Sequence, residues 1–128
     1  MTHMRGVKPP ITPDQEALAR TPPVPSYLSD YAKAEWRRIM PQLIARRIIT
    51  KADLGGIEEY CLMRGVVRQI ETERKQAGGI IDAKLFGVQN RAAQTARQLA
   101  AEYGLSPVSR ARIGNAAPDD DDDNPLNV

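Results

Sequence analysis

Apolar residues recur at intervals of three and four along the middle of the chain, which is the periodicity of helices with one buried face. The first such segment follows Ser29, a favourable N-cap, and Asp30 lies in its first turn, where the helix dipole favours an acid. Its expected buried face comprises Ala32, Trp36, Ile39, Met40 and Leu43. Pro41 falls on the outer side relative to Trp36, so it should bend this helix around whatever Trp36 packs against.

A second helix is predicted from Thr50 to Gln76, because Thr50 and Asp53 resemble a capping box and Gly78-Gly79 supplies a stop. Its apolar positions are Leu54, Ile57, Tyr60, Cys61, Leu62, Met63, Val66, Val67 and Ile70. They cover more than one stripe, so this helix should be buried against its own chain and against a neighbouring subunit. Three glycines lower its helix propensity, and close approach of another backbone is the expected compensation. They are Gly55, Gly56 and Gly65.

Residues 78–88, GGIIDAKLFGV, interrupt the helical pattern and should form either a short β-hairpin or a loop. A third helix is predicted over roughly Gln89 to Tyr103, with Gly104 and Leu105 in the left-handed and hydrophobic positions of a Schellman ending. The pattern therefore predicts an all-α fold, built from a helical hairpin and a third long helix.

The flanks of this helical region have different compositions. Residues 1–25 contain six prolines and are expected to form a flexible arm, whereas residues 26–114 form the helical core. Ser106-Pro107 should start a short C-terminal helix that ends at Gly114. Residues 115–128 are expected to be a disordered acidic tail.

Composition narrows the class of protein. The chain has 128 residues, of which 41% are hydrophobic but only 5% aromatic, so its core is modest and oligomerisation would help to complete it. A single cysteine, Cys61, suits a reducing cytoplasm. No apolar run reaches the ~18 residues of a membrane span.

The net charge of +2 conceals a division between a basic body and an acidic tail. Five of the 16 acidic residues lie at Asp119–Asp123, which leaves residues 1–118 with a net charge of +7. A basic body favours a polyanionic partner, whereas an acidic block is typical of a solvated tail or a docking segment.

Catalysis finds no support in the sequence. His3 is the only histidine, Cys61 lies in an apolar helix, and no phosphate-binding glycine loop is present. The aspartate run offers no fixed geometry for a metal ion. The sequence therefore predicts a protein that is not an enzyme and uses neither a cofactor nor a metal.

Two helices joined by an arginine-rich turn suggest a helix-turn-helix that reads DNA. Asp53, Glu58 and Glu59 on the second helix oppose this hypothesis, because they would face phosphates. In addition, no Arg, Asn or Gln lies between Thr50 and Met63 to read base edges. A helical hairpin within a core is the favoured interpretation.

The basic residues remain candidates for sequence-independent contacts with DNA phosphates. They are Arg37, Arg38, Arg46, Arg47 and Lys51 near the first turn, Arg5, Lys8 and Arg20 on the arm, and Arg110 and Arg112 on the last helix. The alternative is a solvated face with salt bridges to Glu58, Glu59 or a neighbouring subunit.

The acidic tail has two interpretations, a solubilising segment or a segment that docks a partner protein. The candidate docking residues are Asp119, Asp120, Asp121, Asp122, Asp123 and Leu126.

The order of these segments resembles a known family. Residues 22–62, PPVPSYLSDYAKAEWRRIMPQLIARRIITKADLGGIEEYCL, and residues 104–114, GLSPVSRARIG, together resemble the small terminase subunits of tailed bacteriophages, specifically the P27 family. The resemblance covers about residues 22–114. Its motif positions Trp36, Pro41, Asp53 and Tyr60 have the character of structural residues rather than of DNA-reading ones.

This resemblance implies a non-enzymatic part of a genome-packaging motor in the host cytoplasm. Its expected partners are double-stranded viral DNA, the large terminase that carries the ATPase and nuclease, and further copies of itself in a ring, with a nonamer favoured. Residues 1–25 are too few and too proline-rich for a separate DNA-binding domain, so DNA would meet the arm or the surface of the ring. The alternative function is a helical scaffold or adaptor that forms oligomers without binding DNA.

Overall fold

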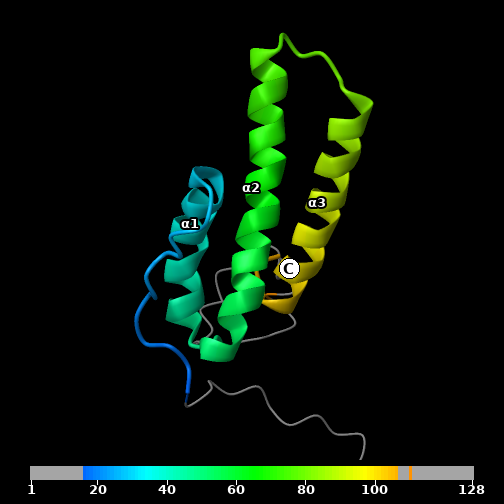
Figure 1. The fold of residues 1–128 in the computed structure, drawn as a ribbon. Helices are drawn as coiled ribbons and strands as arrows, with labels where there is room; N and C mark the ends of the chain where they lie inside the picture. The colour runs from blue at the N-terminus through cyan, green and yellow to red at the C-terminus, as the bar shows by residue number, and fades with distance from the viewer. Residues whose placement is uncertain (1–15, 107–109, 111–128) are drawn as a thin grey trace, which may run out of the picture.

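Three α-helices make up the body of the protein (Figure 1). The computed structural model describes residues 16–106 and Arg110. The helices are α1 (Asp30–Arg46), α2 (Leu54–Gln76) and α3 (Ala83–Glu102), and a single 3₁₀ turn, η1 (Lys51–Asp53), precedes α2. Helix α2 lies between the other two: α1 packs along its lower part, and α3 runs antiparallel to it along most of its length (Figure 1). No strand occurs among the described residues, and the predicted all-α class is confirmed.

Helix α1 begins and packs as its sequence predicts. The Ser29 hydroxyl accepts a hydrogen bond from the Ala32 amide and caps the helix. The predicted face of α1 is fully buried, and Pro41 is exposed on the outer side. The helix ends at Arg47, whose φ of 57° is left-handed and whose amide donates to the Ile44 carbonyl.

The capping box before α2 is confirmed. The Thr50 amide donates to the Asp53 carboxylate at 2.8 Å, and the Thr50 hydroxyl accepts from the first turn. At the other end, Gly78 and Gly79 both have positive φ, and the Gly79 amide donates to the Arg74 carbonyl at 2.8 Å. The predicted stop is therefore a Schellman ending that glycine accommodates without strain.

The expectation for residues 78–88 was wrong in one respect. These residues form neither a β-hairpin nor a loop of that length, because α3 begins at Ala83 rather than near Gln89. Asp82 is the reason: its carboxylate accepts hydrogen bonds from the Lys84 and Leu85 amides at 2.9 and 3.3 Å. This N-cap satisfies amides that would otherwise lack partners, so the helix can start immediately after the glycine turn.

The end of α3 has the predicted Schellman geometry. Gly104 has a φ of 68°, and the Leu105 amide donates to the Ala100 carbonyl at 2.8 Å. The Arg110 amide then donates to the Ser106 carbonyl at 2.9 Å, which is helical spacing. The rest of the predicted C-terminal helix lies outside the described residues.

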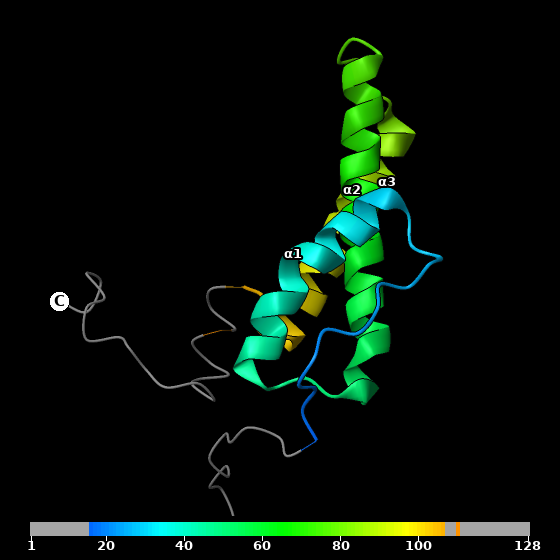
Figure 2. The ribbon, with the colours of Figure 1, turned by 90° about the vertical axis from the view of Figure 1, so that its left-hand side faces the viewer.

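The proline-rich segment ahead of α1 contacts the core. The Leu18 amide donates to the Ile49 carbonyl at 2.9 Å, and the Leu18 and Val24 side chains pack against the buried cluster. The segment runs along the outer side of α1 (Figure 2). This contact ties the arm to the turn between α1 and α2.

The core is concentrated where α1 crosses α2. Its largest fully buried side chains are Trp36, Ile39, Met40, Leu43, Ile49, Ile57 and Cys61. Helix α3 adds mainly small side chains, with only Ala92 and Ala96 buried. The lower half of the molecule is therefore well packed, while the upper part of the α2–α3 hairpin has little buried apolar surface of its own.

The three glycines of α2 have different surroundings. A Cβ on Gly65 would lie 2.9 Å from the Ala32 nitrogen, so the predicted close approach of a second backbone holds at this position. A Cβ on Gly56 would overlap the Tyr103 hydroxyl, which is the end of a side chain. Gly55 has nothing within 4 Å in the described chain, so the expected compensation is missing there.

This difference predicts opposite effects for two matched substitutions. Gly65→Ala should lower the free energy of unfolding by about 1–3 kcal/mol, because the new methyl group overpacks the α1–α2 contact. Gly55→Ala should raise it by up to about 1 kcal/mol through helix propensity alone. Urea unfolding followed by Trp36 fluorescence, at equal protein concentrations, measures both, and a change of the same sign in both variants would contradict the assignment.

Candidate nucleic-acid interface

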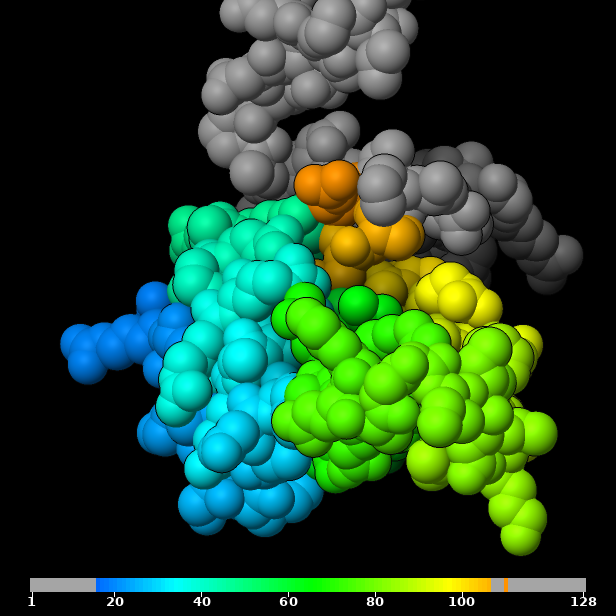
Figure 3. All heavy atoms as spheres, turned by 90° about the horizontal axis from the view of Figure 1, so that it is seen from above, coloured from blue at the N-terminus to red at the C-terminus, as the bar shows by residue number. Residues whose placement is uncertain are grey.

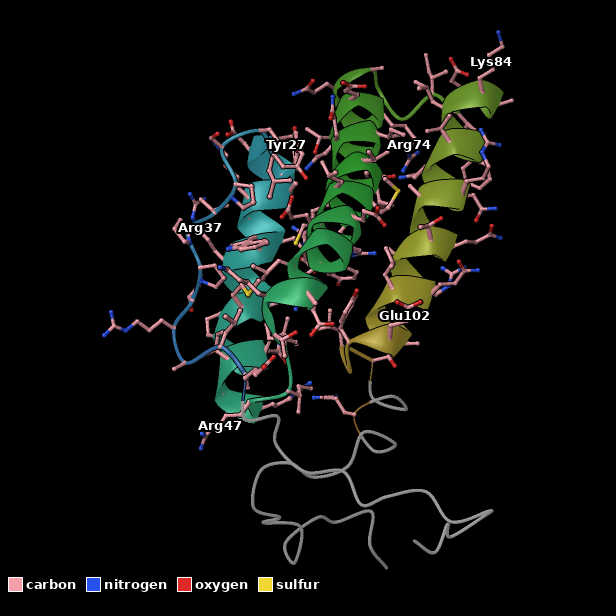
Figure 4. All side chains as sticks on the ribbon, turned by 60° about the horizontal axis from the view of Figure 1, so that its bottom comes forward. Tyr27, Arg37, Arg47, Arg74, Lys84 and Glu102 are labelled. Atoms are coloured by element: carbon pink, nitrogen blue, oxygen red, sulfur yellow. The ribbon has the colours of Figure 1, made fainter. Side chains whose placement is uncertain are left out.

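Four basic residues gather at the end of the bundle where α1 ends, α2 begins and α3 ends. Arg46 and Arg47 close α1, Lys51 lies in η1, and Arg110 follows the end of α3. We call this group the basic end. Arg47 lies at this end and Lys84 at the opposite end of the bundle (Figure 4). The structure thus joins candidates from two distant segments of the sequence.

Arg46 links two elements of the basic end. Its guanidinium donates to the Gly104 carbonyl and, at 3.1 Å, to the Gln42 side-chain oxygen. Partial burial lowers the pKa of Arg46, and the positive charge of nearby Arg110 lowers it further. Arg46 therefore has a structural role, and Arg110 lies close enough for its charge to act on Arg46.

The other members of the basic end are more accessible. Arg47, Lys51 and Arg110 are all exposed, and Lys51 borders a hollow that Glu16 and Leu18 also line. Arg47 adopts its left-handed conformation without being a glycine, the only such case among the described residues. Exposed cations on separate segments around Arg46 offer an anion several contacts at once.

Arg37 and Arg38 are neighbours in sequence but differ in their surroundings. Arg37 is exposed on α1, away from the basic end (Figure 4). Arg38 instead makes two hydrogen bonds to the carboxylate of Glu35, which is only 3% exposed. Arg38 is thus bonded to a buried residue of the core, whereas Arg37 is a solvated cation on the side of α1.

Glu35 is the buried anion that organises this part of the core. It accepts a hydrogen bond from the Tyr60 hydroxyl at 2.7 Å as well as those from Arg38. Burial acts to raise the pKa of Glu35, but the bonds from Arg38 and Tyr60 outweigh it and the pKa is lowered. Burial, followed by the bond to Glu35, raises the pKa of Tyr60 to about 12.

The alternative of salt bridges from the arginines to Glu58 or Glu59 finds no support among the described residues. Among the described residues the ion pairs are Arg38–Glu35 and Arg74–Glu71, and Glu58 instead accepts a hydrogen bond from the Tyr27 hydroxyl at 2.6 Å. Arg20 is exposed on the arm. Other candidates lie outside the described residues: Arg5, Lys8, Arg112, Asp119, Asp120, Asp121, Asp122, Asp123 and Leu126.

The sequence interpretation passed over the cations of α3. Lys84, Arg91 and Arg97 are all exposed, and Glu102 is the only acid in that helix. The excess of basic over acidic residues in 83–102 could have revealed this helix as a cationic one. Residues 83–88, however, were predicted to belong to the break at 78–88 and not to the helix. Lys84 lies at the end of the bundle opposite the basic end, and Arg91 and Arg97 lie between the two ends of α3.

The opposite end of the bundle is apolar. Ile80 and Ile81 are 72% and 70% exposed, and Leu85 and Phe86 lie beside them, 42% and 59% exposed. We call these four residues the apolar tip. With Ile70 and Arg74 they line a hollow of about 310 Å³. Figure 3 looks down onto this end of the molecule, where residues 78–88 form an outer corner.

Three observations bear on nucleophilic chemistry, metal binding and membrane insertion. Burial raises the pKa of the Cys61 thiol to about 12, with a contribution from Glu35, so the thiol stays protonated. In the part of the chain that the structure describes, no three His, Cys, Asp or Glu residues gather as metal ligands. No helix within residues 16–106 has the length and apolar character to cross a bilayer.

The described residues form a helical subunit with a cationic end. Residues 32–120 match the family model of the phage terminase small subunit. Because the match spans more than half of the 128 residues, the chain belongs to this family. It therefore has a role in phage DNA packaging, and the small subunit is generally the non-catalytic one. No curated protein and no solved structure matches the chain.

The buried carboxylate generates a pH prediction. Glu35→Gln should lower the free energy of unfolding by roughly 1.5–3 kcal/mol near neutral pH, because charge-assisted hydrogen bonds are lost. Since the pKa of Glu35 is lowered on folding, its ionised form stabilises the protein fully above about pH 4.5 and less as the pH falls through the folded-state pKa.

The stability difference between wild type and Glu35→Gln should therefore shrink on acidification. Urea unfolding measured between about pH 7 and about pH 3 checks this. Glu59→Gln, at an exposed position, serves as the control and should remain within about 0.5 kcal/mol of wild type. A difference for Glu35→Gln that grows at low pH would contradict the role of the buried carboxylate.

Proposed function

We propose that this chain is the DNA-binding subunit of a phage packaging motor, that it assembles into a ring, and that it recruits and regulates the large terminase ATPase-nuclease. The observation that carries the DNA-binding part is the basic end. There, cations from the close of α1, from η1 and from the segment after α3 lie together. The membership of the family supplies the packaging context.

Phosphate contact suits this geometry better than base reading. Helix α2 packs against α1 on one side and α3 on the other, and the exposed acid Glu59 lies in its N-terminal part, so α2 is poorly suited to enter a major groove. The Asp53 carboxylate lies at its start and is engaged in the capping box. The exposed cations surround a helix end instead, which supports a fit to the sugar–phosphate backbone with little dependence on sequence.

This mode of binding predicts a steep salt dependence. If the four cations of the basic end each neutralise one phosphate, log K should fall with log salt at a slope of roughly −3 to −4. Reversing two exposed charges, in the variant Arg47→Glu/Lys51→Glu, should weaken binding and flatten the slope. Fluorescence anisotropy with a labelled duplex measures both quantities.

The matched control is Lys75→Glu/Lys84→Glu, which changes the net charge equally at the opposite end of the bundle (Figure 4). It should retain most of the affinity. Equal weakening by both variants would mean that DNA responds to net charge rather than to the basic end. Affinity that does not change with salt would overturn the phosphate-contact hypothesis.

The alternative function is an adaptor that assembles without binding DNA. A gel shift that compares phage-end DNA with random DNA separates the two functions. Retention of either duplex supports the packaging role, and no retention by the assembled protein supports the adaptor.

The apolar tip supports self-association. Four large apolar side chains in one exposed patch are costly in water, and such patches mark interaction sites. The core of a single subunit leaves this end of the α2–α3 hairpin thinly packed, and a neighbouring subunit would cover it. The ring, with a nonamer as the favoured size, follows from the resemblance of the sequence.

The native mass tests this assembly. Wild type should give a multiple of the 14.2 kDa subunit by light scattering, and Ile81→Asp/Phe86→Asp should shift the mass toward a single subunit. Gln98→Asp, at an exposed position on α3, is the control and should keep the mass of wild type. An unchanged mass in the tip variant would exclude the apolar tip as the subunit contact.

The acidic tail, with Asp119–Asp123 and Leu126, is the proposed docking segment for the large terminase. Its charge is opposite to that of the body, so it is distinct from the surface assigned to DNA. The assembly would operate in the cytoplasm of the infected bacterium.

A further inference from the structure

The acidic run is tethered to the basic end. Arg110, whose positive charge acts on Arg46, is only nine residues before Asp119. Nine residues span at most about 30 Å when fully extended. Helix α2, with 23 residues, is about 35 Å long and separates the basic end from the apolar tip. The basic end is therefore the surface nearest to the run, and Asp119 itself cannot reach the apolar tip.

The charges of the two segments complement each other. The basic end holds four cations, and the run holds five carboxylates. In the described part of the chain, neither ion pair involves a residue of the basic end. Arg46 and Arg110 also repel each other, because two like charges share this corner. An anion brought to this point relieves that repulsion, and a short tether gives it an effective concentration of millimolar order.

We propose that Asp119–Asp123 occupy the basic end of their own chain in the absence of DNA and compete with DNA phosphates for Arg46, Arg47, Lys51 and Arg110. The intramolecular contact stands on the tether and the charges, whereas the competition rests on the proposed DNA-binding function. The bound tail then lowers the affinity of the protein for DNA of random sequence. A partner that captures the tail exposes the basic end at the same time.

Zero-length crosslinking tests the contact without DNA. A carbodiimide joins a carboxylate to an amine only where the two touch, and Lys51 is the lysine of the basic end. In the full-length protein at low salt, mass spectrometry should find Lys51 joined to the 119–123 run. Lys75 and Lys84, toward the far end of α2 and α3, are internal controls and should not be joined to it.

The isotope pattern identifies the chain that supplies the tail. In an assembly refolded from mixed ¹⁴N and ¹⁵N subunits, a contact within one chain gives only uniformly labelled crosslinked peptides. Mixed-label peptides as the main product would overturn the same-chain assignment. Links spread evenly over Lys51, Lys75 and Lys84, or no link to Lys51, would overturn the contact itself.

Neutralising the tail tests the competition. Changing Asp119–Asp123 to asparagine should tighten binding to a random duplex about fivefold at low salt, the effect of freeing a site that is open about one-fifth of the time. The gain should vanish at high salt, because screening weakens the tail and DNA contacts together. In an Arg47→Gln/Arg110→Gln background the same change should have no effect.

A gain that persists in that background would mean that the tail repels DNA through net charge alone, and this would overturn the competition. Affinity that is unaffected by neutralisation in the wild-type background would do the same. A protein that shows the Lys51 crosslink but binds no duplex under any condition would refute the proposed DNA-binding function and leave the intramolecular contact intact. The two failures are therefore distinguishable.

Discussion

The close approach of α1 and α2 at Ala32 and Gly65 is the contact on which the rest of the structure depends. A glycine at this crossing lets the two backbones meet where any side chain would hold them apart. With the axes fixed at that distance, Glu35 comes within reach of Tyr60 and the apolar face of α1 closes over α2. The position at which α1 ends, and therefore the position of the basic end, follows from this crossing.

The subunit is divided into two ends with opposite chemistry. Its core lies in the lower half beside the basic end, where Arg46 is bonded to the carbonyl of Gly104, just beyond α3. Its upper half is a two-helix hairpin with mostly small buried side chains and an apolar tip. The surface proposed for DNA and the surface proposed for subunit contact therefore lie at opposite ends of the subunit.

Local capping signals made much of the fold predictable. Ser29, Thr50 with Asp53, and Gly104 each mark a boundary through bonds between residues close in sequence, and all three formed as expected. Asp82 is also a local signal, but the glycine pair and the two isoleucines before it pointed to a hairpin or a loop, which hid the start of α3. Two local patterns therefore compete in this segment, and the helix starts at the N-cap.

The candidate site was less predictable, because the fate of each arginine depends on tertiary contacts. In sequence, Arg37-Arg38 and Arg46-Arg47 are equivalent pairs. In the fold, one member of each pair bonds to a group fixed by helix packing, Arg38 to a buried carboxylate and Arg46 to a carbonyl of a distant segment. Neither bond has a signature in the spacing of the residues. The nearness of Arg110 to Arg46 likewise required α3 to return to the end of α1.

The left-handed backbone of Arg47 carries a cost of its own. Glycine adopts this conformation freely, whereas a side chain pays roughly 1–2 kcal/mol for it. The protein thus retains a charged residue at the one helix ending where a neutral and smaller residue would fold better. Such conflicts between local stability and residue type are expected at functional or strained positions. Arg47 therefore places a positive charge, at some cost in folding energy, on the surface proposed to contact DNA.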